Sequence, residues 1–547
     1  MQPIPCHSGT REDTLQKGNE VSEWWQGAVV YQIYPRSFCD SNGDGIGDLK
    51  GITSRLDYVA GLGVDAIWIS PFFTSPMHDF GYDVADFRGV DPIFGTIDDF
   101  DTLIAKAHEA GLKVIIDQVY SHTSMECDWF KESRKCATNP KADWYVWADA
   151  KPDGSPPNNW QSVFSGAAWT WDASRKQYYL HNFLSQQPDL NIHTPAVQEE
   201  LYRVAKFWLD KGVDGFRLDA TNFYMHDPAL RDNPPLDNPN GTRPFDFQSQ
   251  QYNQSHPNIV TFIEKLRALI DKYPGRFTVA EVGGHKSLEE MALYTAGNNR
   301  LNTAYSFVFL EAPTLSAAVI RNALEKWDAN TSSWPSWTFS NHDRPRAVTR
   351  WGTGKDRGNF SKMLNAMLVS LRGTAFLYQG EELGLPQARV PFERLVDPEA
   401  IANWPETLGR DGTRTPHPWD ANSPSAGWSS DAWLPVDDTH VRLNVEAQEA
   451  DTESTLHATR RLFALRKTLA PLVHGSLSFV DTHEPLLVYI RELNGERILC
   501  VMNLGDTPQK LQLDILGGAT ALYGESADLT PSGLQLGTYG HSFLRLA

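Results

Sequence analysis

The stretch VQEELYRVAKFWLDKGVDGFRLDA, residues 197–220, decides the fold of this chain. Residues 197–212 carry apolar side chains at helical spacing and end at a glycine, which predicts a helix. Residues 213–220 form a short run rich in apolar side chains, which predicts a strand. Units of this kind recur along the chain, and repeated strand–helix units indicate a parallel sheet with its helices outside.

The alternation of strands and helices continues on both sides of this stretch. Further strands are predicted at 28–35, 64–70, 113–120, 276–282, 334–340 and 374–380. Further helices are predicted at 52–63, 100–112 and 261–274. A chain of 547 residues is too long for one ordinary core, and its length suits a closed barrel better than a short open sheet. The predicted fold class is therefore α/β, a TIM (β/α)₈ barrel with additions.

The alternation of predicted strands and helices stops in two places, and near the C-terminus the pattern becomes that of strands alone. Residues 122–185, after the third strand, are rich in Trp, Asn, Pro and Gly and predict an inserted subdomain, and residues 386–450 are a second irregular stretch. After a helix predicted at 454–471, apolar residues alternate with period two around Asn494-Gly495, which is a strong hairpin signal. We therefore divide the chain into a polar tail (1–23), a barrel (24–121 and 186–471), an inserted subdomain (122–185) and a C-terminal antiparallel β domain (472–547).

Net charge, cysteine content and the distribution of apolar residues limit the partners and the compartment that the sequence predicts. The formal net charge of −19 argues against a nucleic-acid partner, because phosphate binding needs clustered Lys and Arg. The five cysteines are few and scattered, which favours a reducing compartment over a disulfide framework. The N-terminal segment has no apolar signal region, and no apolar run approaches the roughly 20 residues of a membrane span. We expect a cytoplasmic protein that binds a small molecule and no membrane, and the sequence leaves its oligomeric state open.

Carboxylates stand at the ends of four predicted strands. Because side chains alternate along a strand, Arg217 and Asp219 in GFRLD share one face. Glu281 closes the apolar run FTVAE, Asp117 closes KVIID, and Asp343 lies in SNHDRPR. A buried structural ion pair would explain Arg217 and Asp219 alone. Four carboxylates at the strand ends where such barrels hold their active sites indicate catalysis instead.

Glycoside cleavage is the chemistry that such carboxylates permit. One carboxyl group protonates the leaving oxygen, and another attacks the sugar or activates water. The two need different pKa values, which their surroundings set. Arg217 beside Asp219 is expected to keep that carboxylate ionised as a nucleophile, and Glu281, on a more apolar strand, is the better candidate to hold a proton.

Six motifs occur in the order of the signature regions of one family: DVADFRGVDPIFGT, DQVYSH, QPDLN, GFRLDA, EVGG and SNHDRPR. On these motifs the chain resembles the α-amylase superfamily, in its α-glucosidase and oligo-1,6-glucosidase branch, from about residue 24 to the end. The resemblance implies a retaining, exo-acting α-glucosidase that hydrolyses terminal α-glucosidic bonds of small sugars by double displacement. It implies no organic cofactor.

The resemblance also implies a role for each matching residue. Asp219 matches the family nucleophile, Glu281 the general acid/base, and Asp343 the third carboxylate, which stabilises the distorted sugar and the transition state. Asp117 resembles a structural acid under the site. The residues that match the glucose subsite or its entrance are Asp79, Tyr82, His122, Phe164, Phe183, Arg217, His342 and Arg410.

The segment DSNGDGIGD, residues 40–48, has the oxygen-ligand spacing of an EF-hand loop. The candidate ligands are the side chains of Asp40, Asn42, Asp44 and Asp48 and the carbonyl oxygen of Ile46. Related α-glucosidases bind Ca²⁺ or Mg²⁺ with such a loop, so we expect a structural ion here. The alternative is a metal-free Asx turn, because Gly51 stands where an EF-hand has its last Glu. The calcium site typical of amylases is not expected, because Ser121 replaces its Asn.

Ala220 directly follows Asp219, at a position that resembles a linkage selector in this branch. Enzymes for α-1,6 bonds usually carry Val there, whereas α-1,4- and sucrose-active enzymes tend to carry Thr or Ala. A branched Val would crowd an α-1,4-linked or fructosyl leaving group. We therefore expect a preference for short α-1,4-glucosides or sucrose over isomaltose. The alternative is that Ala220 merely packs behind the strand.

Related activities are the remaining alternatives. A sucrose hydrolase or transglucosylase of the same branch would use the same glycosyl-enzyme. A trehalose-phosphate hydrolase would look similar, although nothing in the sequence marks a phosphate pocket. A sucrose isomerase is disfavoured because its RLDRD motif is absent. A non-catalytic relative of the transporter-ancillary type is disfavoured because Asp219, Glu281 and Asp343 are all retained and no membrane anchor is found.

Overall fold

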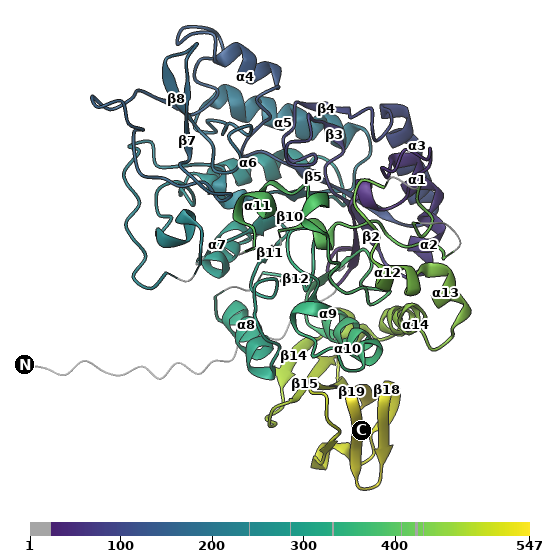
Figure 1. Cartoon of the computed structure of the whole chain (residues 1–547). Coiled ribbons are helices and arrows are strands. Elements are labelled where there is room, and N and C mark those ends of the chain that lie inside the picture. The colour runs from purple at the N-terminus through teal and green to yellow at the C-terminus, as the bar shows by residue number, and fades with distance from the viewer. Residues whose placement is uncertain are drawn as a thin grey trace, which may run out of the picture.

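Eight parallel strands close almost completely into a barrel at the centre of the molecule (Figure 1). The computed structural model describes residues 23–547 apart from 240, 285, 331, 332, 406, 408, 422–424, 430 and 431, so the tail predicted at 1–23 lies outside the described residues except for Glu23. In sheet order the strands are β11 (Thr303–Ser306), β10 (Phe277–Val282), β9 (Gly215–Leu218), β5 (Lys113–Gln118), β2 (Ala66–Ile69), β1 (Val29–Ile33), β13 (Thr374–Tyr378) and β12 (Ser336–Thr338). The predicted TIM barrel is confirmed.

Side chains of the barrel strands alternate between the interior and the surrounding helices. On β9, Phe216 and Leu218 pack into the apolar layer beneath the helices, and Arg217 between them points inward to charged partners. The apolar cluster of the interior includes Trp68, Ile115, Val279, Tyr305 and Phe376. Where the ladder ends, between β11 and β12, the hydroxyl oxygens of Thr303 and Ser336 lie 2.7 Å apart, so a side-chain hydrogen bond bridges the two edges.

Helices connect the strands and cover the outside of the barrel (Figure 1). They are α1 (Leu49–Ser54), α2 (Leu56–Gly61), α3 (Ile97–Glu109), α5 (Pro195–Asp210), α6 (Ile259–Ile270), α7 (Ser287–Tyr294), α8 (Ala317–Asn330), α9 (Ala347–Arg350), α10 (Arg357–Ser370) and α14 (Thr455–Thr468). Local sequence sets their starts. Thr96 caps α3 in a reciprocal pair with Asp99, and Pro195 opens α5, where no N–H is needed within the helix.

The helix predicted at 52–63 differs from the structure. It begins earlier, at Leu49, and is interrupted at Arg55. The hydroxyl groups of Thr53 and Ser54 donate hydrogen bonds to carbonyl oxygens of the preceding turn. Such back-bonding competes with the regular ladder and bends helices, which accounts for the interruption.

Two further elements depart from the prediction. The helix predicted at 454–471 ends at Thr468, and α15 (Ala470–His474) begins anew with Pro471 near its start, because proline cannot continue the ladder of a preceding helix. Strand β11 was not predicted, since its four residues, TAYS, contain no apolar run.

A small subdomain lies between β5 and α5. It contains α4 (Asp128–Ser133) and a three-stranded antiparallel sheet of β6 (Trp147–Ala148), β8 (Gln177–Leu180) and β7 (Trp169–Asp172). A separate antiparallel pair, β3 (Phe73–Thr74) and β4 (Asp86–Val90), lies earlier in the chain. The subdomain has its own apolar cluster around Trp160 and Trp169. Figure 1 shows it on the side of the barrel opposite the C-terminal sheet.

The C-terminal part is an antiparallel sheet. Its strands are β14 (Ser476–Phe479), β15 (Leu486–Leu493), β16 (Glu496–Asn503), β17 (Gln509–Leu511), β18 (Thr520–Thr530) and β19 (Gly533–Arg545). The predicted hairpin is confirmed, because Asn494 and Gly495 join β15 to β16 with φ angles of 51° and 84°. Between β13 and α14, the described part of the stretch predicted as irregular contains three short α-helices, α11 (Pro398–Asn403), α12 (Asp438–Arg442) and α13 (Val445–Ala450). Our domain boundaries at 121, 185 and 471 stay a prediction.

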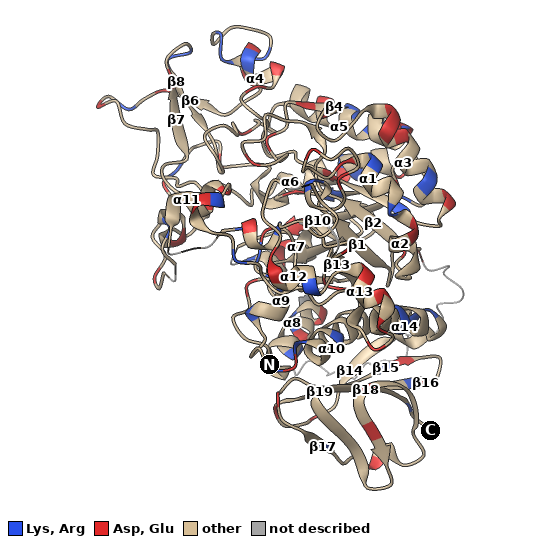
Figure 2. Ribbon diagram, turned by 45° about the vertical axis from the view of Figure 1, so that its right-hand side comes forward, with Lys and Arg blue, Asp and Glu red and all other residues tan. Residues whose placement is uncertain are grey.

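Charged residues of both signs are interspersed over the outer surface. Figure 2 shows Lys and Arg among Asp and Glu along α3 and in the segments around α11 and α12. Among the helices that the structure describes, none combines the length and apolar character needed to cross a membrane.

Candidate active site

The buried Arg217 pairs with carboxyl groups from three neighbouring strands. Its Nη1 donates to Asp117 Oδ1 at 2.7 Å and to Asp219 Oδ1 at 2.5 Å, and its Nη2 lies 2.5 Å from Glu281 Oε1. The register of the barrel explains this meeting. Arg217 is paired with Asp117 on β5 and with Val279 on β10, and Glu281 lies two residues beyond Val279 on the same face.

Burial raises the pKa of both Asp219 and Glu281 to about 7, and Arg217 opposes the rise in each case. We expected Arg217 to keep Asp219 ionised, and its charge does lower the pKa of Asp219, but the guanidinium is shared and lowers that of Glu281 as well. The two groups repel one another when both are ionised, so they titrate as a pair. Near neutral pH the pair favours one proton, which suits a nucleophile beside an acid.

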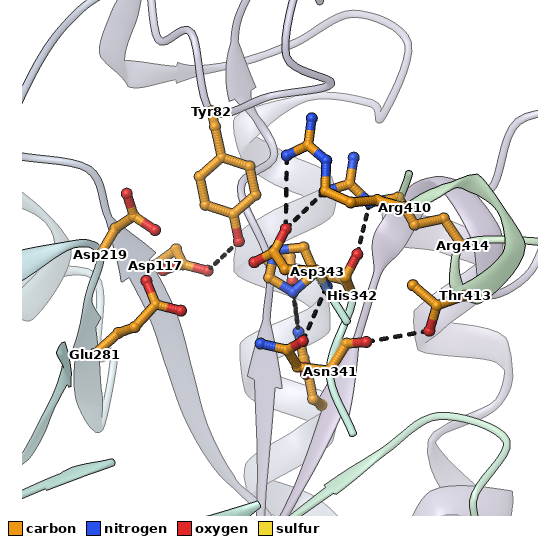
Figure 3. Close-up of polar contacts among 12 residues, drawn as sticks. Tyr82, Asp117, Asp219, Glu281, Asn341, His342, Asp343, Arg410, Thr413 and Arg414 are labelled. Atoms are coloured by element: carbon orange, nitrogen blue, oxygen red, sulfur yellow. Dashed lines mark hydrogen bonds and ion pairs between the residues drawn. The ribbon is translucent and has the colours of Figure 1, made fainter. Parts of the chain in front are cut away.

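Asp343 forms the opposite side of the site (Figure 3). Arg414 Nη2 donates to its Oδ1 at 2.8 Å, and Arg410 Nη1 lies 3.6 Å from the same oxygen. Burial alone would raise the pKa of Asp343, but the charges around it, including both arginines, outweigh burial and hold the pKa below its ordinary value. Asp343 is therefore ionised. Arg414 was not predicted, although GRDGTRTP carries two arginines four residues apart.

Asp79 and Arg410 form a polar chain beside the three carboxylates. Arg410 Nη2 donates to Asp79 Oδ1 at 2.8 Å and to Asp397 Oδ1 at 2.9 Å. Gln187 Nε2 donates to Asp79 Oδ2 at 3.0 Å. Charged donors and acceptors held in this way suit the hydroxyl groups of a sugar. Sequence reasoning missed Asp397 and Gln187, although Gln187 opens the motif QPDLN.

Tyr82 and His342 stack with ring centroids 5.2 Å apart and planes 6° apart. Tyr82 also donates its hydroxyl hydrogen to Asp117 Oδ2 at 3.1 Å. Gln32 Nε2 lies 2.8 Å from His342 Nδ1, and His342 Nε2 lies 3.2 Å from Asp343 Oδ2. Burial holds the pKa of His342 well below its ordinary value, so the ring is neutral.

His122 is fixed by its neighbours. Its Nε2 lies 3.0 Å from the Tyr82 carbonyl oxygen, and Ser121 Oγ lies 2.9 Å from its Nδ1. Burial lowers the pKa of His122 to about 4, so this ring is also neutral. Ser121, where the sequence departs from the amylase pattern, thus positions His122.

A cavity of about 130 Å³ collects most of the predicted site residues. Those that line it are Asp79, Tyr82, His122, Phe164, Phe183, Asp219, Ala220, Glu281, Asp343 and Arg410. The other two, Arg217 and His342, are fully buried behind its wall. Five lining residues were not predicted: Val163, Arg243, Phe307, Arg344 and Glu399. Only Arg344, which directly follows Asp343, had a signal in the motifs.

A second, larger cavity of about 380 Å³ adjoins the first; we call them the outer and inner cavities. The two share lining residues, among them Glu281 and Ala220. The lining of the outer cavity also contains the charged residues Arg243, Asp246, Glu311 and Arg344. The rest of it is mostly apolar or carries side-chain amides, with Phe183, Phe223, Leu236, Phe245, Phe307, Asn222, Asn238, Gln250 and Gln254.

The predicted metal loop is formed by Asx turns. Asp40 accepts backbone N–H groups of Asn42 at 3.1 Å and Gly45 at 2.8 Å, and Asp44 accepts that of Ile46 at 2.9 Å. Asp48 caps α1. Within the described part of the chain, no group of three or more His, Cys, Asp or Glu side chains is placed to hold a metal ion.

Comparison with known families agrees with this geometry. The model of the alpha amylase catalytic domain matches residues 32–475, which is most of the chain. The chain belongs to the α-amylase family. The model of the maltogenic amylase C-terminal domain matches residues 477–539. As an α-amylase-family glycoside hydrolase, the chain is an enzyme, and the resemblance noted from its motifs is confirmed.

Members of the α-amylase family resemble this one over nearly its whole length. A probable alpha-glucosidase of Rhizobium meliloti (strain 1021) is 48% identical over 542 residues, covering 96% of this chain and 97% of the relative. An oligo-1,6-glucosidase of Parageobacillus thermoglucosidasius is 39% identical over 518 residues, covering 88% and 91%. The solved structure of the alpha-glucosyl transfer enzyme XgtA superposes with a TM-score of 0.94 at 50% identity, covering 96% of this chain and 100% of that one.

Proposed function

We propose that the protein is a retaining, exo-acting α-glucosidase for small sugars. The observation that carries the proposal is the meeting of Asp219 and Glu281 on one buried guanidinium, at the junction of the two cavities. Retaining glycosidases use one carboxylate to attack the sugar and another to protonate the leaving group. The relatives named alpha-glucosidase and oligo-1,6-glucosidase support the same reaction class.

In the proposed mechanism, Asp219 attacks the anomeric carbon and forms a covalent glucosyl-enzyme. Glu281 donates its proton to the departing oxygen and then takes a proton from the incoming water. Asp343, ionised between two arginines, binds sugar hydroxyls and stabilises the developing positive charge. Asp79 and Arg410 bind further hydroxyls, and the ring of Tyr82 covers the apolar face of the sugar.

Retention is the first prediction. Two displacements at the anomeric carbon restore the original configuration, so α-glucose should form before mutarotation. Proton NMR of the early glucose from nitrophenyl α-glucoside measures this directly, because that substrate releases no second sugar. Early β-glucose would contradict the double displacement, because a single displacement by water inverts the carbon.

For the linkage preference, we propose short α-1,4-glucosides or sucrose over isomaltose. Ala220 supports this proposal, because it lines both cavities rather than packing behind β9. Its N–H donates to Glu281 Oε2 at 3.2 Å, and its backbone is left-handed, with φ at 40°. A larger side chain here would therefore meet the leaving group directly.

Ala220→Val should shift the ratio of kcat/KM for maltose over isomaltose toward isomaltose by about tenfold, the scale of one or two methylene groups in a pocket. Initial rates on maltose, sucrose, isomaltose, trehalose and nitrophenyl α-glucoside measure the shift. Because a β-branched residue is strained at positive φ, Ala220→Gly is the matched control that relaxes the backbone without crowding the cavity. A wild-type preference for isomaltose would refute the proposal.

Transfer of glucose to another hydroxyl group is the second candidate. The outer cavity favours it, because this cavity is larger than the inner one and opens beside Glu281, where an acceptor would replace water. The similar structure of XgtA is described as that of an alpha-glucosyl transfer enzyme. Oligosaccharides formed at high maltose concentration would mark transfer, and free glucose alone would mark hydrolysis.

We also propose that the loop of residues 40–48 binds Ca²⁺ or Mg²⁺ for stability and takes no part in the reaction. Alternating carboxylate and amide side chains and the turn at Gly45, with φ at 86°, support this. Excess EDTA should lower the melting temperature by about 2–4 °C, the shift expected for roughly 1 kcal/mol in a large domain. Asp44→Ala should abolish the response, and Asp153→Ala, in an unrelated exposed turn, should retain it. No response in the wild type would refute the site.

We propose a cytoplasmic location because the described cysteines are free thiols. Cys39, Cys127, Cys136 and Cys500 are all free, and three of them are buried. Free thiols persist in reducing compartments, which is where proteins without disulfides are usually found.

A further inference from the structure

The outer cavity lies on the leaving-group side of the reacting bond. The two cavities meet at Glu281, which the proposed function assigns as the proton donor to the leaving oxygen. A group that receives this proton must stand on the same side as Glu281. The side chains of the outer cavity therefore select the leaving group, and their charges decide which leaving groups are tolerated.

Arg243 is one of the two cations in the described lining of the outer cavity, and it is engaged by two carboxylates. Its Nη2 lies 2.9 Å from Asp246 Oδ1, and its Nη1 lies 3.4 Å from Glu399 Oε1. Nη1 also donates to the Val163 carbonyl oxygen at 3.2 Å. The Arg243 and Glu399 side chains are 20% and 12% exposed, so water screens this pair only in part.

Arg344 is the other cation of this lining, and it is also paired. Its Nη2 lies 2.5 Å from Glu311 Oε1, and its guanidinium lies over the ring of Phe307 at 5.0 Å. The Glu311 side chain is 56% exposed at the rim of the cavity. A ligand that approaches Arg344 from solvent therefore meets the carboxylate of Glu311 as well.

The charge balance of this region is negative. The two arginines face Asp246, Glu311 and Glu399, and Glu281 stands at the inner boundary. The other described residues of the outer lining are apolar, glycine or neutral amides. Phenylalanine rings and amides suit a leaving group with an apolar face and neutral hydroxyl groups. A phosphate or carboxylate would have to displace an existing ion pair before it found a cation.

We propose that Glu311 and Glu399 are specificity residues that exclude anionic leaving groups from the outer cavity, which takes neutral leaving groups such as sugars or aromatic alcohols. The proposal rests on the proposed α-glucosidase function and deepens it. Both carboxylates occupy arginines that would otherwise attract an anion, and they repel the anion themselves. When both carboxylates are removed, the cavity keeps its two arginines, Arg243 and Arg344, but their positive charges are less neutralised.

The test compares 4-carboxyphenyl α-glucoside with 4-carbamoylphenyl α-glucoside, which have nearly the same shape and differ by one negative charge at neutral pH. The measured quantity is the ratio of their kcat/KM values, anionic over neutral. The ratio should rise about tenfold in Glu311→Gln/Glu399→Gln, the scale of removing partly screened charges near a ligand. Glu325→Gln, on the exposed surface of α8, is the matched control and should leave the ratio unchanged.

A third substitution identifies the cation that is released. Glu311→Gln alone should raise the ratio of kcat/KM values, because it frees Arg344. Adding Arg344→Gln should cancel this rise, because the carboxylate of the substrate would then have no cation to pair with. In the wild type, high salt should raise the ratio, because it screens the exposed Glu311. A ratio that neither the double variant nor salt alters would overturn the proposal. Loss of the α-glucosidase function itself would be recognised separately, as a wild-type enzyme inactive on both glucosides.

Discussion

Asp219→Asn should lower kcat/KM on maltose by about 10⁴-fold or more, because an amide cannot form the covalent glucosyl-enzyme. Asp219→Ala with added azide tests the role directly. Azide should enter from the vacated face and give β-glucosyl azide, a product of single inversion. Recovery of α-glucosyl azide from this variant would assign Asp219 the role of acid/base instead, and substantial activity in Asp219→Asn would refute the nucleophile.

Asp219→Asn should also change the stability of the protein. Burial raises the pKa of Asp219 from 3.8 to about 7, so the native protein binds this proton more tightly than the unfolded chain. Stability is therefore lost as pH rises from about 4 to 7. Asp219→Asn removes the ionisable group and should melt at a higher temperature than the wild type at pH 8, with a smaller difference at pH 5. A lower melting temperature at both pH values would contradict the burial argument.

Glu281→Gln should lower turnover of maltose by about 10³-fold, within the range typical of general acid–base catalysis. Maltose has a poor leaving group that needs protonation, whereas dinitrophenyl α-glucoside leaves without a proton. Single-turnover measurements should therefore show a much smaller loss of the glucosylation rate on the aryl substrate. Equal losses on both substrates would count against the acid role.

Azide provides the matched comparison for Glu281. In Glu281→Ala the glucosyl-enzyme still forms from the activated substrate, and azide then attacks it without base assistance. The product should be α-glucosyl azide, opposite to that of Asp219→Ala. The two products together distinguish nucleophile from acid/base without reference to absolute rates.

The barrel could be predicted because its strands are apolar runs that alternate with amphipathic helices. This pattern is local, and it failed where local signals conflict. Strand β11 is short and polar, and the hydroxyl groups of Thr53 and Ser54 interrupt a segment whose apolar spacing is helical throughout. The first departure reflects the lack of an apolar run, and the second reflects side-chain hydrogen bonds that hydrophobic spacing does not encode.

The inner part of the site could be predicted for a similar reason. Arg217, Asp219 and Glu281 end parallel strands, and barrel geometry brings such ends together. Arg243 and Glu399 could not be predicted, because they come from segments 156 positions apart that meet within 3.4 Å. The effect of Arg217 on the pKa of Glu281 as well as of Asp219 was also out of reach, because it depends on how many carboxylates share the guanidinium.

The residues that form the wall of the outer cavity come from segments between the barrel strands and helices, and this affects which substitutions the enzyme could accept. Val163 comes from the segment between β5 and α5, Phe245 from the segment between β9 and α6, and Glu399, through its contact with Arg243, from the segment between β13 and α14. Strands supply Arg217 and Glu281, and Asp219 directly follows β9. Loops tolerate substitution better than a packed barrel. A mutagenic library restricted to the outer-cavity residues of these segments, with His122 and Arg410 left unchanged, should therefore yield new acceptor ranges while the glucose requirement persists.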